Sequence, residues 1–251
     1  MKEVVEGDPA EGLLLSGGLD TSVIASIASK KRKNLKAFTV TLKGYEEDLK
    51  YAKKVTEFLD LDHIIYHFSE EEMIKAVPCV MRITKCRYFE IKSIVPVFIA
   101  MKVAKDHVGS LYVGDGADEL FAGYSPMVTL IDLLTDERYD FSINLRDNFE
   151  DYFYKTLFED SGEYLRSPHK IGEVMGIDVK VPYLDRRIRE YARKIPMEYK
   201  VREEKGKRWG KWILRKAFEG FLPEEIIWRE KVPIDIGAGS MKLKLDKILN
   251  K

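Results

Sequence analysis

Glutamine is absent from this sequence of 251 residues, and cysteine occurs only twice, at Cys79 and Cys86. Two cysteines cannot build a disulfide framework, and without a second Cys or His pair at ligand spacing they do not make a zinc site. Lys and Glu are plentiful, and together with the lack of glutamine this composition is typical of proteins from very hot habitats. We therefore interpret both cysteines as ordinary thiols.

The sequence also lacks a long hydrophobic run and a net charge. The longest apolar stretch, residues 94–101, contains Pro96 and is far shorter than the roughly 20 residues of a membrane-spanning helix. The first eight residues carry acidic side chains and no apolar core, unlike a secretory signal. Lys plus Arg and Asp plus Glu both number 42, so no global field favours nucleic acid. These features predict a cytoplasmic protein with neither a membrane nor a nucleic-acid partner.

The hydrophobic pattern predicts one α/β domain over residues 1–251. Short apolar runs alternate with helical periodicities through the first half, which indicates βαβ units and a parallel, doubly wound sheet. The expected strands are residues 12–15, 36–42, 63–68 and 111–113. After Tyr124 we expect no further strands, so residues 12–124 form the α/β core and residues 125–251 a mainly helical elaboration.

Helices are expected after each of the first strands, and one is expected in the second half. Apolar residues recur at helical spacing in residues 23–28, 49–59 and 97–104. In the second half, Asp185 is a plausible N-cap for a helix that extends to Ile195. Residues 135–166 give no clear pattern.

A glycine loop follows the first predicted strand and carries the strongest chemical signal. Two adjacent glycines allow a tight turn with inward-pointing amides, hydroxyls add donors, and the next helix contributes its positive N-terminal end. The loop predicts an anion cradle, and because it contains a carboxylate but no lysine, it should need a metal ion such as Mg²⁺ between that carboxylate and a phosphate. The residues of this predicted cradle are Ser16, Gly17, Gly18, Asp20, Thr21 and Ser22.

This segment resembles the PP-loop of the N-type ATP pyrophosphatases, which adenylate a substrate and release pyrophosphate. Two further motifs resemble the asparagine synthetase family within that superfamily. Residues 114–124 follow the fourth strand and match its glycine-acid-glycine turn, in which Asp115 replaces Glu of the best-known members. Residues 181–185, 210–215 and 228–231 then follow in the family's order, so the resemblance covers residues 13–240.

The acidic residues of the second motif would repel a nucleotide unless they bound a cation. We therefore expect Asp118 to be the second magnesium ligand beside Asp20, and Gly114 to contact ATP. Glu119 is a candidate substrate contact, with helix capping or structural hydrogen bonding as an equally good interpretation.

The resemblance implies further roles in the C-terminal half and near the second strand. Lys211 matches the family lysine that contacts phosphates, and with Asp115 it is our candidate catalytic residue. On a helical wheel, Arg208, Lys211 and Arg215 share one arc, and we expect both arginines to lie on a solvated face. The backbone of Phe38, Thr39 and Val40 would contact adenine. Lys92 alone keeps the basic character of the segment that binds aspartate in bacterial asparagine synthetases.

The implied reaction is ATP-dependent activation of a carboxylate, with aspartate as the best candidate, followed by attack of ammonia or another amine to give an amide. Because only about ten residues precede the first predicted strand, we expect no glutaminase domain and instead expect free ammonia, a separate glutaminase subunit or a different amine. A second copy of the chain is a further candidate partner. The alternatives are another adenylating enzyme, of argininosuccinate synthetase or tRNA-modifying type, and a non-catalytic ATP-binding subunit.

Overall fold

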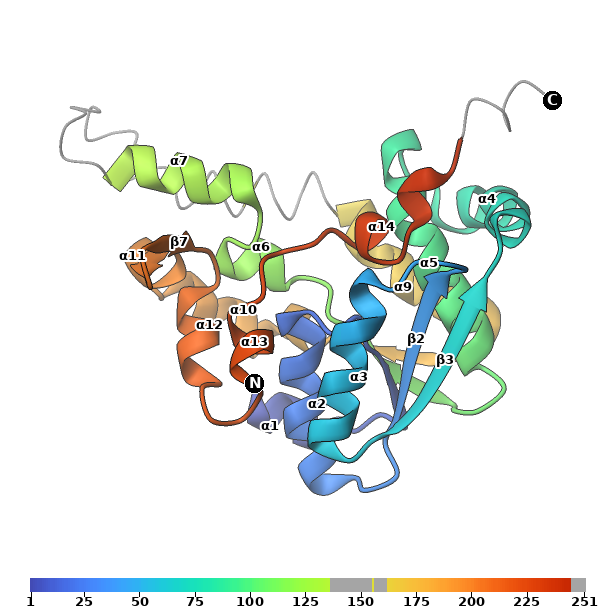
Figure 1. The fold of residues 1–251 in the computed structure, drawn as a ribbon, viewed down its shortest axis with the longest axis horizontal. Coiled ribbons are helices and arrows are strands. Elements are labelled where there is room, and N and C mark those ends of the chain that lie inside the picture. Colours follow the sequence, from blue (N-terminus) through green and yellow to red (C-terminus); the bar gives the residue numbers. More distant parts are fainter. Residues whose placement is uncertain (136–154, 156–161, 245–251) are drawn as a thin grey trace.

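A computed structural model describes residues 1–135, 155 and 162–244 (Figure 1). Its centre is a five-stranded sheet in the order β3-β2-β1-β4-β5, in which every neighbouring pair is parallel. Leu14 lies opposite Phe38, and Leu13 lies opposite Tyr112. The strands are β1 (Gly12–Leu14), β2 (Lys36–Leu42), β3 (Asp62–Phe68), β4 (Ser110–Tyr112) and β5 (Asp178–Lys180).

Helices cover both faces of this sheet. One face packs against α1 (Lys2–Gly7), α2 (Leu19–Lys31) and α3 (Glu47–Leu59), and the other against α4 (Glu70–Thr84), α5 (Ile91–Ala104) and α9 (Gly162–Met175). Neighbouring residues of a strand point to opposite faces, so Ala37 enters the first core and Phe38 the second. Both faces are therefore apolar, which is why the strands appear in the sequence as continuous hydrophobic runs.

The remaining elements are short and return the chain to the sheet. The α12 and α13 segments bury Leu214 and Ile226 in the same core as Leu13 of β1. In Figure 1 these orange and red elements lie beside α2. The complete set of remaining elements is α6 (Ala117–Phe121), α7 (Ser125–Thr135), α10 (Arg186–Arg193), α11 (Met197–Lys200), β6 (Arg202–Glu204), β7 (Lys207–Trp209), α12 (Trp212–Ala217), α13 (Glu224–Ile227), α14 (Ile234–Gly237), and the 3-10 turns η1 (Tyr88–Glu90), η2 (Pro182–Leu184) and η3 (Ser240–Lys242).

The predicted doubly wound parallel sheet is confirmed, but one expectation about the elements is wrong. Strands do not end at Tyr124, because β5 pairs with β4 at the edge of the sheet and β6 pairs with β7 in a separate hairpin. With three residues each, these strands are too short to produce a recognisable alternation. Most of residues 135–166, which gave no pattern, lie outside the described residues.

Helix α4 was not anticipated, although its start carries a clear signal. Ser69 accepts a hydrogen bond from the Glu72 amide while the Glu72 carboxylate accepts one from the Ser69 amide, so both form a capping box. The predicted N-cap at Asp185 is present, since its carboxylate accepts a hydrogen bond from the Arg187 amide at 2.8 Å.

The order of the strands determines where the two glycine motifs meet. From β1 the chain builds outward to β2 and β3, and it then returns to β4 on the other side of β1. The crevice at the carboxyl ends of β1 and β4 is the position where open α/β sheets bind ligands.

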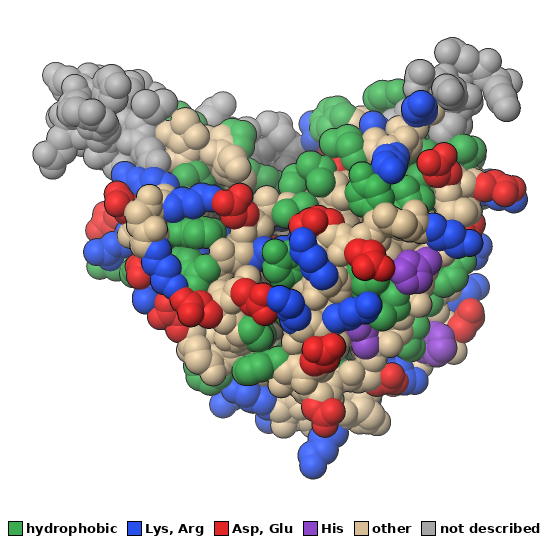
Figure 2. Space-filling view, in the orientation of Figure 1, with side chains coloured by type: hydrophobic (Ala, Val, Ile, Leu, Met, Phe, Trp, Pro, Cys, Tyr) green, Lys and Arg blue, Asp and Glu red, His purple; other side chains and the backbone are tan. Residues whose placement is uncertain are grey.

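No helix within the described part of the chain is long and apolar enough to cross a bilayer. On the face in Figure 2, acidic and basic side chains are interspersed.

Candidate active site

The glycine loop (residues 16–22) follows β1, includes the first turn of α2 and is shaped by contacts that only glycine permits. Gly17 has φ of +68°, and a Cβ atom there would lie 2.3 Å from the Ala52 nitrogen. Ser16 Oγ accepts a hydrogen bond from the Gly18 amide at 3.3 Å, and Ser22 Oγ donates one to the Gly18 carbonyl at 2.7 Å. The loop is therefore pressed against α3 and leaves the N-terminal amides of α2 available to an anion.

The second glycine motif packs directly against this loop. A Cβ atom on Gly114 would lie 2.8 Å from Cγ2 of Thr21, and Gly116 has φ of +92° where the chain enters α6. These glycines place Asp118 and Glu119, in the first turn of α6, beside Asp20 in the first turn of α2.

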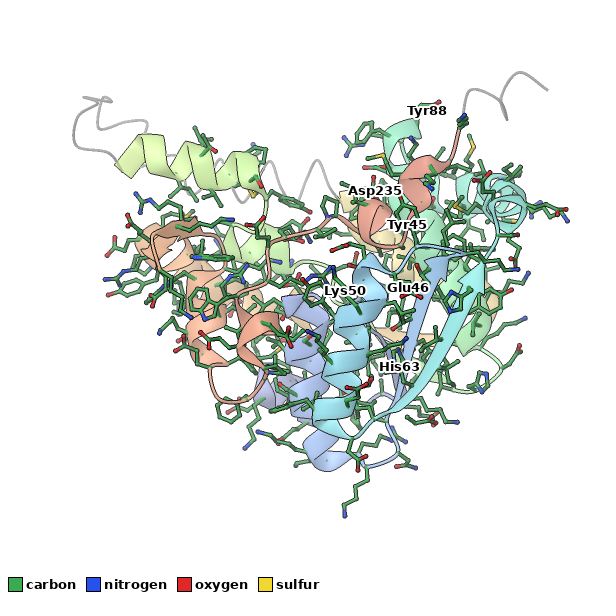
Figure 3. All side chains as sticks on the ribbon, viewed as in Figure 1. Tyr45, Glu46, Lys50, His63, Tyr88 and Asp235 are labelled. Carbon is green, nitrogen blue, oxygen red and sulfur yellow. The ribbon has the colours of Figure 1, made fainter. Side chains whose placement is uncertain are left out.

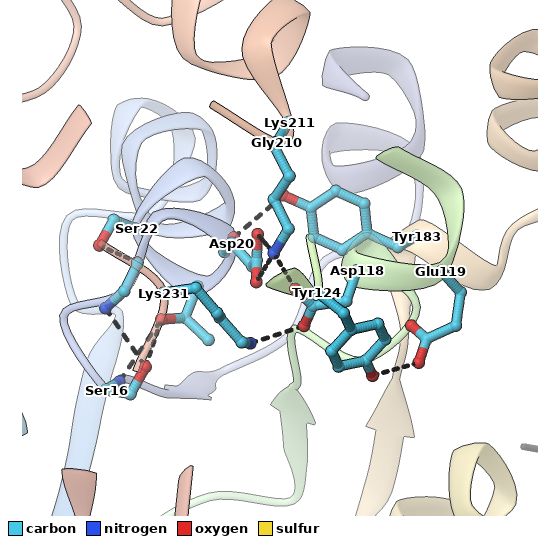
Figure 4. A network of polar contacts seen from close by, with 12 residues as sticks. Ser16, Asp20, Ser22, Asp118, Glu119, Tyr124, Tyr183, Gly210, Lys211 and Lys231 are labelled. Atoms are coloured by element: carbon cyan, nitrogen blue, oxygen red, sulfur yellow. Dashed lines mark hydrogen bonds and ion pairs between the residues drawn. The ribbon is translucent and has the colours of Figure 1, made fainter. Parts of the chain in front are cut away.

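Four charged side chains alternate in sign across the junction and form what we call the charge chain (Asp20, Lys211, Asp118 and Lys231; Figure 4). Lys211 Nζ lies 2.7 and 2.6 Å from the two carboxylate oxygens of Asp20 and 2.6 Å from Asp118 Oδ1. Lys231 Nζ donates to Asp118 Oδ2 at 2.6 Å. The formal charges of the four groups sum to zero.

Glycine also makes room for the charge chain. A Cβ atom on Gly123 would lie 1.9 Å from Asp118 Oδ1 and 2.3 Å from Lys211 Cε. Lys211 is 3% exposed, and its backbone has φ of +55°, which L-residues rarely adopt. The Lys211 amide donates to the Phe121 carbonyl at 2.8 Å. Helix α6 therefore fixes the Lys211 backbone and also supplies Asp118, which contacts the Lys211 side chain.

Electrostatics keep Asp118 and Lys231 charged. Burial raises the pKa of Asp118, but the ammonium groups of Lys211 and Lys231 outweigh burial and hold that pKa well below its ordinary value. Burial lowers the pKa of Lys231, but Asp118 and Asp20 outweigh it and raise the pKa above its usual range.

Two carboxyl groups beside the charge chain have the opposite tendency. Burial, reinforced by the Glu119 carboxylate, raises the pKa of Asp115 to about 7. Burial and the neighbouring Asp118 also raise the pKa of Glu119. Glu119 accepts a hydrogen bond from the Tyr124 hydroxyl at 2.6 Å, and α6 has no side-chain N-cap, so of the two structural interpretations of Glu119 hydrogen bonding is present and capping is not.

These groups line a cavity of about 560 Å³. The predicted residues that line it are Ser16, Gly18, Asp20, Thr21, Phe38, Thr39, Val40, Gly114, Asp115, Asp118, Glu119 and Lys211. Three others do not: Gly17 packs on α3, the Ser22 hydroxyl is turned to the Gly18 carbonyl, and Lys92 Nζ donates to the Met241 carbonyl at 3.2 Å. Arg87, which sequence reasoning missed, also lines the cavity, where it pairs with Glu90.

The prediction for Arg215 is wrong, because this side chain is buried and 5% exposed. Residues 207–209 form a strand and α12 begins only at Trp212, so the helical wheel placed the arginine incorrectly. Its guanidinium lies 4.7 Å from the Trp209 ring centroid and donates to the Gly210 and Arg229 carbonyls at 3.0 Å each. Burial lowers its pKa to about 10. Arg208 is exposed, as expected.

Arg229 and Asp48 form a buried ion pair beside the glycine loop, and sequence reasoning missed both. Their side chains are 5% and 6% exposed, and Arg229 Nη2 lies 2.6 Å from Asp48 Oδ1. Arg229 also donates to the Ser16 carbonyl at 3.2 Å and stacks on Tyr51 at 4.0 Å. The pair thus joins α3, the glycine loop and the segment that carries Lys231. The one sequence signal that could have indicated Arg229 and Lys231 is their position inside the third motif, and Asp48 has no such signal.

A hydrogen-bond relay supports the strand that was expected to contact adenine. The Thr39 hydroxyl donates to the Leu15 carbonyl at 2.6 Å, and His63 Nε2 lies 2.8 Å from Thr39 Oγ1. His63 Nδ1 lies 3.1 Å from Thr56 Oγ1, so the ring links β3 to both β2 and α3 (Figure 3). Burial, aided by Lys53, lowers the pKa of His63 to about 4 and keeps the ring neutral.

The residues of the charge chain fit a magnesium ion. Asp20 and Asp118 direct carboxylate oxygens to one point, where the Lys211 ammonium now lies, and carboxylates are the ligands that Mg²⁺ prefers. Among the described residues no group of three or more His, Cys, Asp or Glu side chains is arranged to hold a metal. Further ligands would therefore have to be phosphate oxygens and water, as is usual for this ion.

Comparison with known proteins adds sequence evidence. The family model for asparagine synthase matches residues 1–146 and 146–251. A probable glutamine-hydrolysing asparagine synthetase of Dictyostelium discoideum is 32% identical over 92% of this chain and 43% of its own length. The corresponding enzyme of Asparagus officinalis is 30% identical over 91% of this chain and 39% of its own length. The chain thus spans about two fifths of these relatives.

Solved structures give a weaker likeness. An NMN synthetase of Francisella tularensis is 21% identical, with a TM-score of 0.35 over 49% of this chain and 53% of its own. An NH3-dependent NAD synthetase of Campylobacter jejuni is 15% identical, with a TM-score of 0.36 over 78% of this chain and 92% of its own.

Proposed function

Because the chain belongs to the asparagine synthase family, we propose that it is an ATP-dependent amide-forming ligase that adenylates a carboxylate and transfers the acyl group to ammonia or an amine. We further propose that residues 1–251 act as one synthetase domain, in which residues 12–124 bind the nucleotide and residues 125–251 complete the cavity. The observation that carries the proposal is the charge chain, which meets the glycine loop at the carboxyl ends of β1 and β4.

The first step would be attack of the substrate carboxylate on the α-phosphorus of ATP. A new O–P bond forms, the bond between the α-phosphorus and its bridging oxygen breaks, and pyrophosphate leaves. The amides of the glycine loop and the Lys211 and Lys231 ammonium groups would bind the departing phosphates, because fixed cations stabilise charge that develops in a transition state. Mg²⁺ held by Asp20 and Asp118 would supply further charge neutralisation at the phosphates.

The second step would be attack of ammonia on the acyl carbon, which forms the C–N bond and breaks the bond between that carbon and the phosphate oxygen of AMP. The attacking nitrogen must lose a proton, so a base is needed near the acyl group. Asp115 lines the cavity, and its pKa of about 7 suits a carboxylate that accepts a proton near neutral pH. We propose that Asp115 is this base.

Aspartate remains the proposed carboxylate substrate, although Lys92, which was expected to contact it, does not line the cavity. Arg87 lines the cavity and supplies a guanidinium to it, and Glu90 Oε1 holds this group at 2.8 and 2.6 Å from Arg87 Nε and Nη2. We propose that ammonia enters either free or from a separate glutaminase subunit.

The proposal is tested by measuring pyrophosphate release from ATP and Mg²⁺ across a panel of amino acids with ammonium supplied. We expect release that depends on aspartate, with AMP and asparagine as products. Release of ADP and phosphate would contradict every adenylating mechanism, and release with another carboxylate would change the substrate but not the chemistry. An Asp20→Ala variant, which loses a predicted metal ligand, is expected to be inactive although folded.

A further inference from the structure

The Lys211 ammonium lies where a cation shared by the two predicted metal ligands would lie. It is within 2.6 to 2.7 Å of both Asp20 oxygens and within 2.6 Å of Asp118 Oδ1 (Figure 4). A magnesium ion ligated by both carboxylates would need to sit about 2.1 Å from an oxygen of each. The ion and the ammonium group therefore cannot occupy this position together.

The charges of the site lead to the same conclusion as the steric argument. The charge chain is neutral by itself, with Asp20 and Asp118 balanced by Lys211 and Lys231. A divalent ion added alone would bring uncompensated positive charge into a buried group, which is costly in a medium of low dielectric constant. The negative charges of a triphosphate would offset it, so the ion and the nucleotide are expected to enter together.

The lysine can leave this position without leaving the cavity. Its backbone is fixed by the hydrogen bond from its amide to the Phe121 carbonyl, so it is the side chain, whose Cε lies against Gly123, that can move. Lys211 lines the same cavity as Ser16 and Gly18 of the glycine loop. A displaced ammonium group would therefore remain beside the bound phosphates.

We propose that Lys211 is a placeholder for the divalent cation: in the nucleotide-free protein it occupies the position between Asp20 and Asp118 and excludes the ion, and metal-nucleotide binding transfers it to the phosphates. This inference rests on the proposed function, since it assumes that the cavity binds a metal-nucleotide complex. It assigns to Lys211 a second role, the exclusion of free metal, that phosphate binding alone does not require.

The test measures Mn²⁺ binding to the full chain without nucleotide. The electron paramagnetic resonance signal of free Mn²⁺ reports how much of the ion remains unbound. Wild type is expected to bind no Mn²⁺ at concentrations that saturate Lys211→Met, a difference in affinity of at least tenfold. Lys231→Met is the matched control, because it removes the same charge from Asp118 but leaves Lys211 between the carboxylates. It is expected to bind Mn²⁺ as weakly as wild type.

Three results would overturn the proposal. The first is nucleotide-free wild type that binds Mn²⁺ as tightly as Lys211→Met, and the second is a folded Lys211→Met that does not bind Mn²⁺. The third is equal Mn²⁺ binding by both methionine variants, which would show that the charge of the lysines and not the position of Lys211 excludes the ion. If Lys211→Met does not fold, Lys211→Gly decides, since glycine adopts φ of +55° without strain. Pyrophosphate release by wild type is measured in parallel, so failure of the placeholder is distinguished from failure of the proposed function.

Discussion

At the residue scale, Asp115 shows how burial changes the chemistry of a common side chain. It follows Gly114 at the end of β4, and burial together with Glu119 raises its pKa to about 7. Between about pH 4 and pH 7 the folded protein therefore binds more protons at this position than the unfolded chain does. Its ionisation costs stability as pH rises through that window, while the same ionisation produces the base that the second step needs.

Asp115→Asn is expected to lose the amide-forming step and to gain stability at pH 8. The gain should shrink as pH falls towards 4, because the wild-type carboxyl is then protonated and costs nothing. Chemical denaturation of both proteins across this pH range measures the difference, and asparagine formation measures the activity. A stability difference that grows towards low pH would contradict the assigned pKa.

Gly123 is the second residue at which a single atom decides the site. A Cβ atom there would overlap Asp118 Oδ1 and Lys211 Cε, so Gly123→Ala must displace the charge chain. We expect at least a tenfold loss of pyrophosphate release and a loss of about 1–3 kcal/mol in the free energy of unfolding, the usual cost of overpacking.

The matched control for Gly123→Ala is Gly7→Ala at the end of α1. No atom lies within 4 Å of a Cβ built there, and its φ is not positive. This variant is expected to keep full activity and a free energy of unfolding within about 0.5 kcal/mol of wild type. Full activity of Gly123→Ala would show that the charge chain is not essential.

At the scale of elements, α3 is joined to the C-terminal half by two ion pairs in different environments. Asp48 pairs with Arg229 where both side chains are about 95% buried, whereas Lys54 pairs with Glu225 at the surface, where both are nearly half exposed. Only the first pair also contacts the glycine loop, through the Ser16 carbonyl. Asp48 therefore has a structural role and a positioning role, and Glu225 has neither.

Asp48→Asn is expected to lower the free energy of unfolding by about 3–5 kcal/mol, because it leaves the buried Arg229 without a counter-charge. Glu225→Gln breaks the exposed pair and should cost about 0–1 kcal/mol. Denaturant titrations measure both. In Asp48→Asn the KM for ATP should rise as well, since Arg229 no longer holds the glycine loop, and equal stability of the two variants would contradict the burial of this pair.

The local elements were largely predictable from sequence, and the exceptions have identifiable causes. Strand β2 and helix α3 follow from a continuous apolar run and from helical spacing, which are properties of neighbouring residues. Arg215 was misplaced because a helical wheel assumes that residues 207–217 form one helix, whereas the hairpin β6–β7 interrupts it. The wheel cannot report that the rings of Trp209 and Trp228, whose centroids are 5.4 Å apart, both lie beside the Arg215 guanidinium.

At the scale of the whole molecule, the cavity is built from both halves of the chain. Asp20 and Lys211 are 191 positions apart, and Asp118 and Lys231 are 113 apart. A nucleotide that contacts the glycine loop and both lysines would therefore connect the α/β core to the C-terminal segment. Binding to the folded state alone raises the stability of the entire chain.

A nonhydrolysable ATP analogue with Mg²⁺ is expected to raise the melting temperature, and the increase should grow with ligand concentration. At one hundred times the dissociation constant the stabilisation would be about 2.7 kcal/mol. The analogue with excess chelator should give a smaller shift, because the charge chain then keeps Lys211 between its carboxylates. No shift under either condition would contradict nucleotide binding in this cavity.

The amino-acid sequence alone predicts the parallel sheet and the position of the glycine loop, because buried strands and positive-φ turns depend on residues that are adjacent in the chain. It also indicated Asp20, Asp118 and Lys211 as members of one site. The packing of the two halves places Lys211 between the two carboxylates, brings Lys231 to Asp118 and Arg229 to Asp48 and the glycine loop, and turns Lys92 away from the cavity. The physical reason is that ion pairing, burial and pKa depend on distance in space, which the packing of the two halves sets and local sequence does not encode.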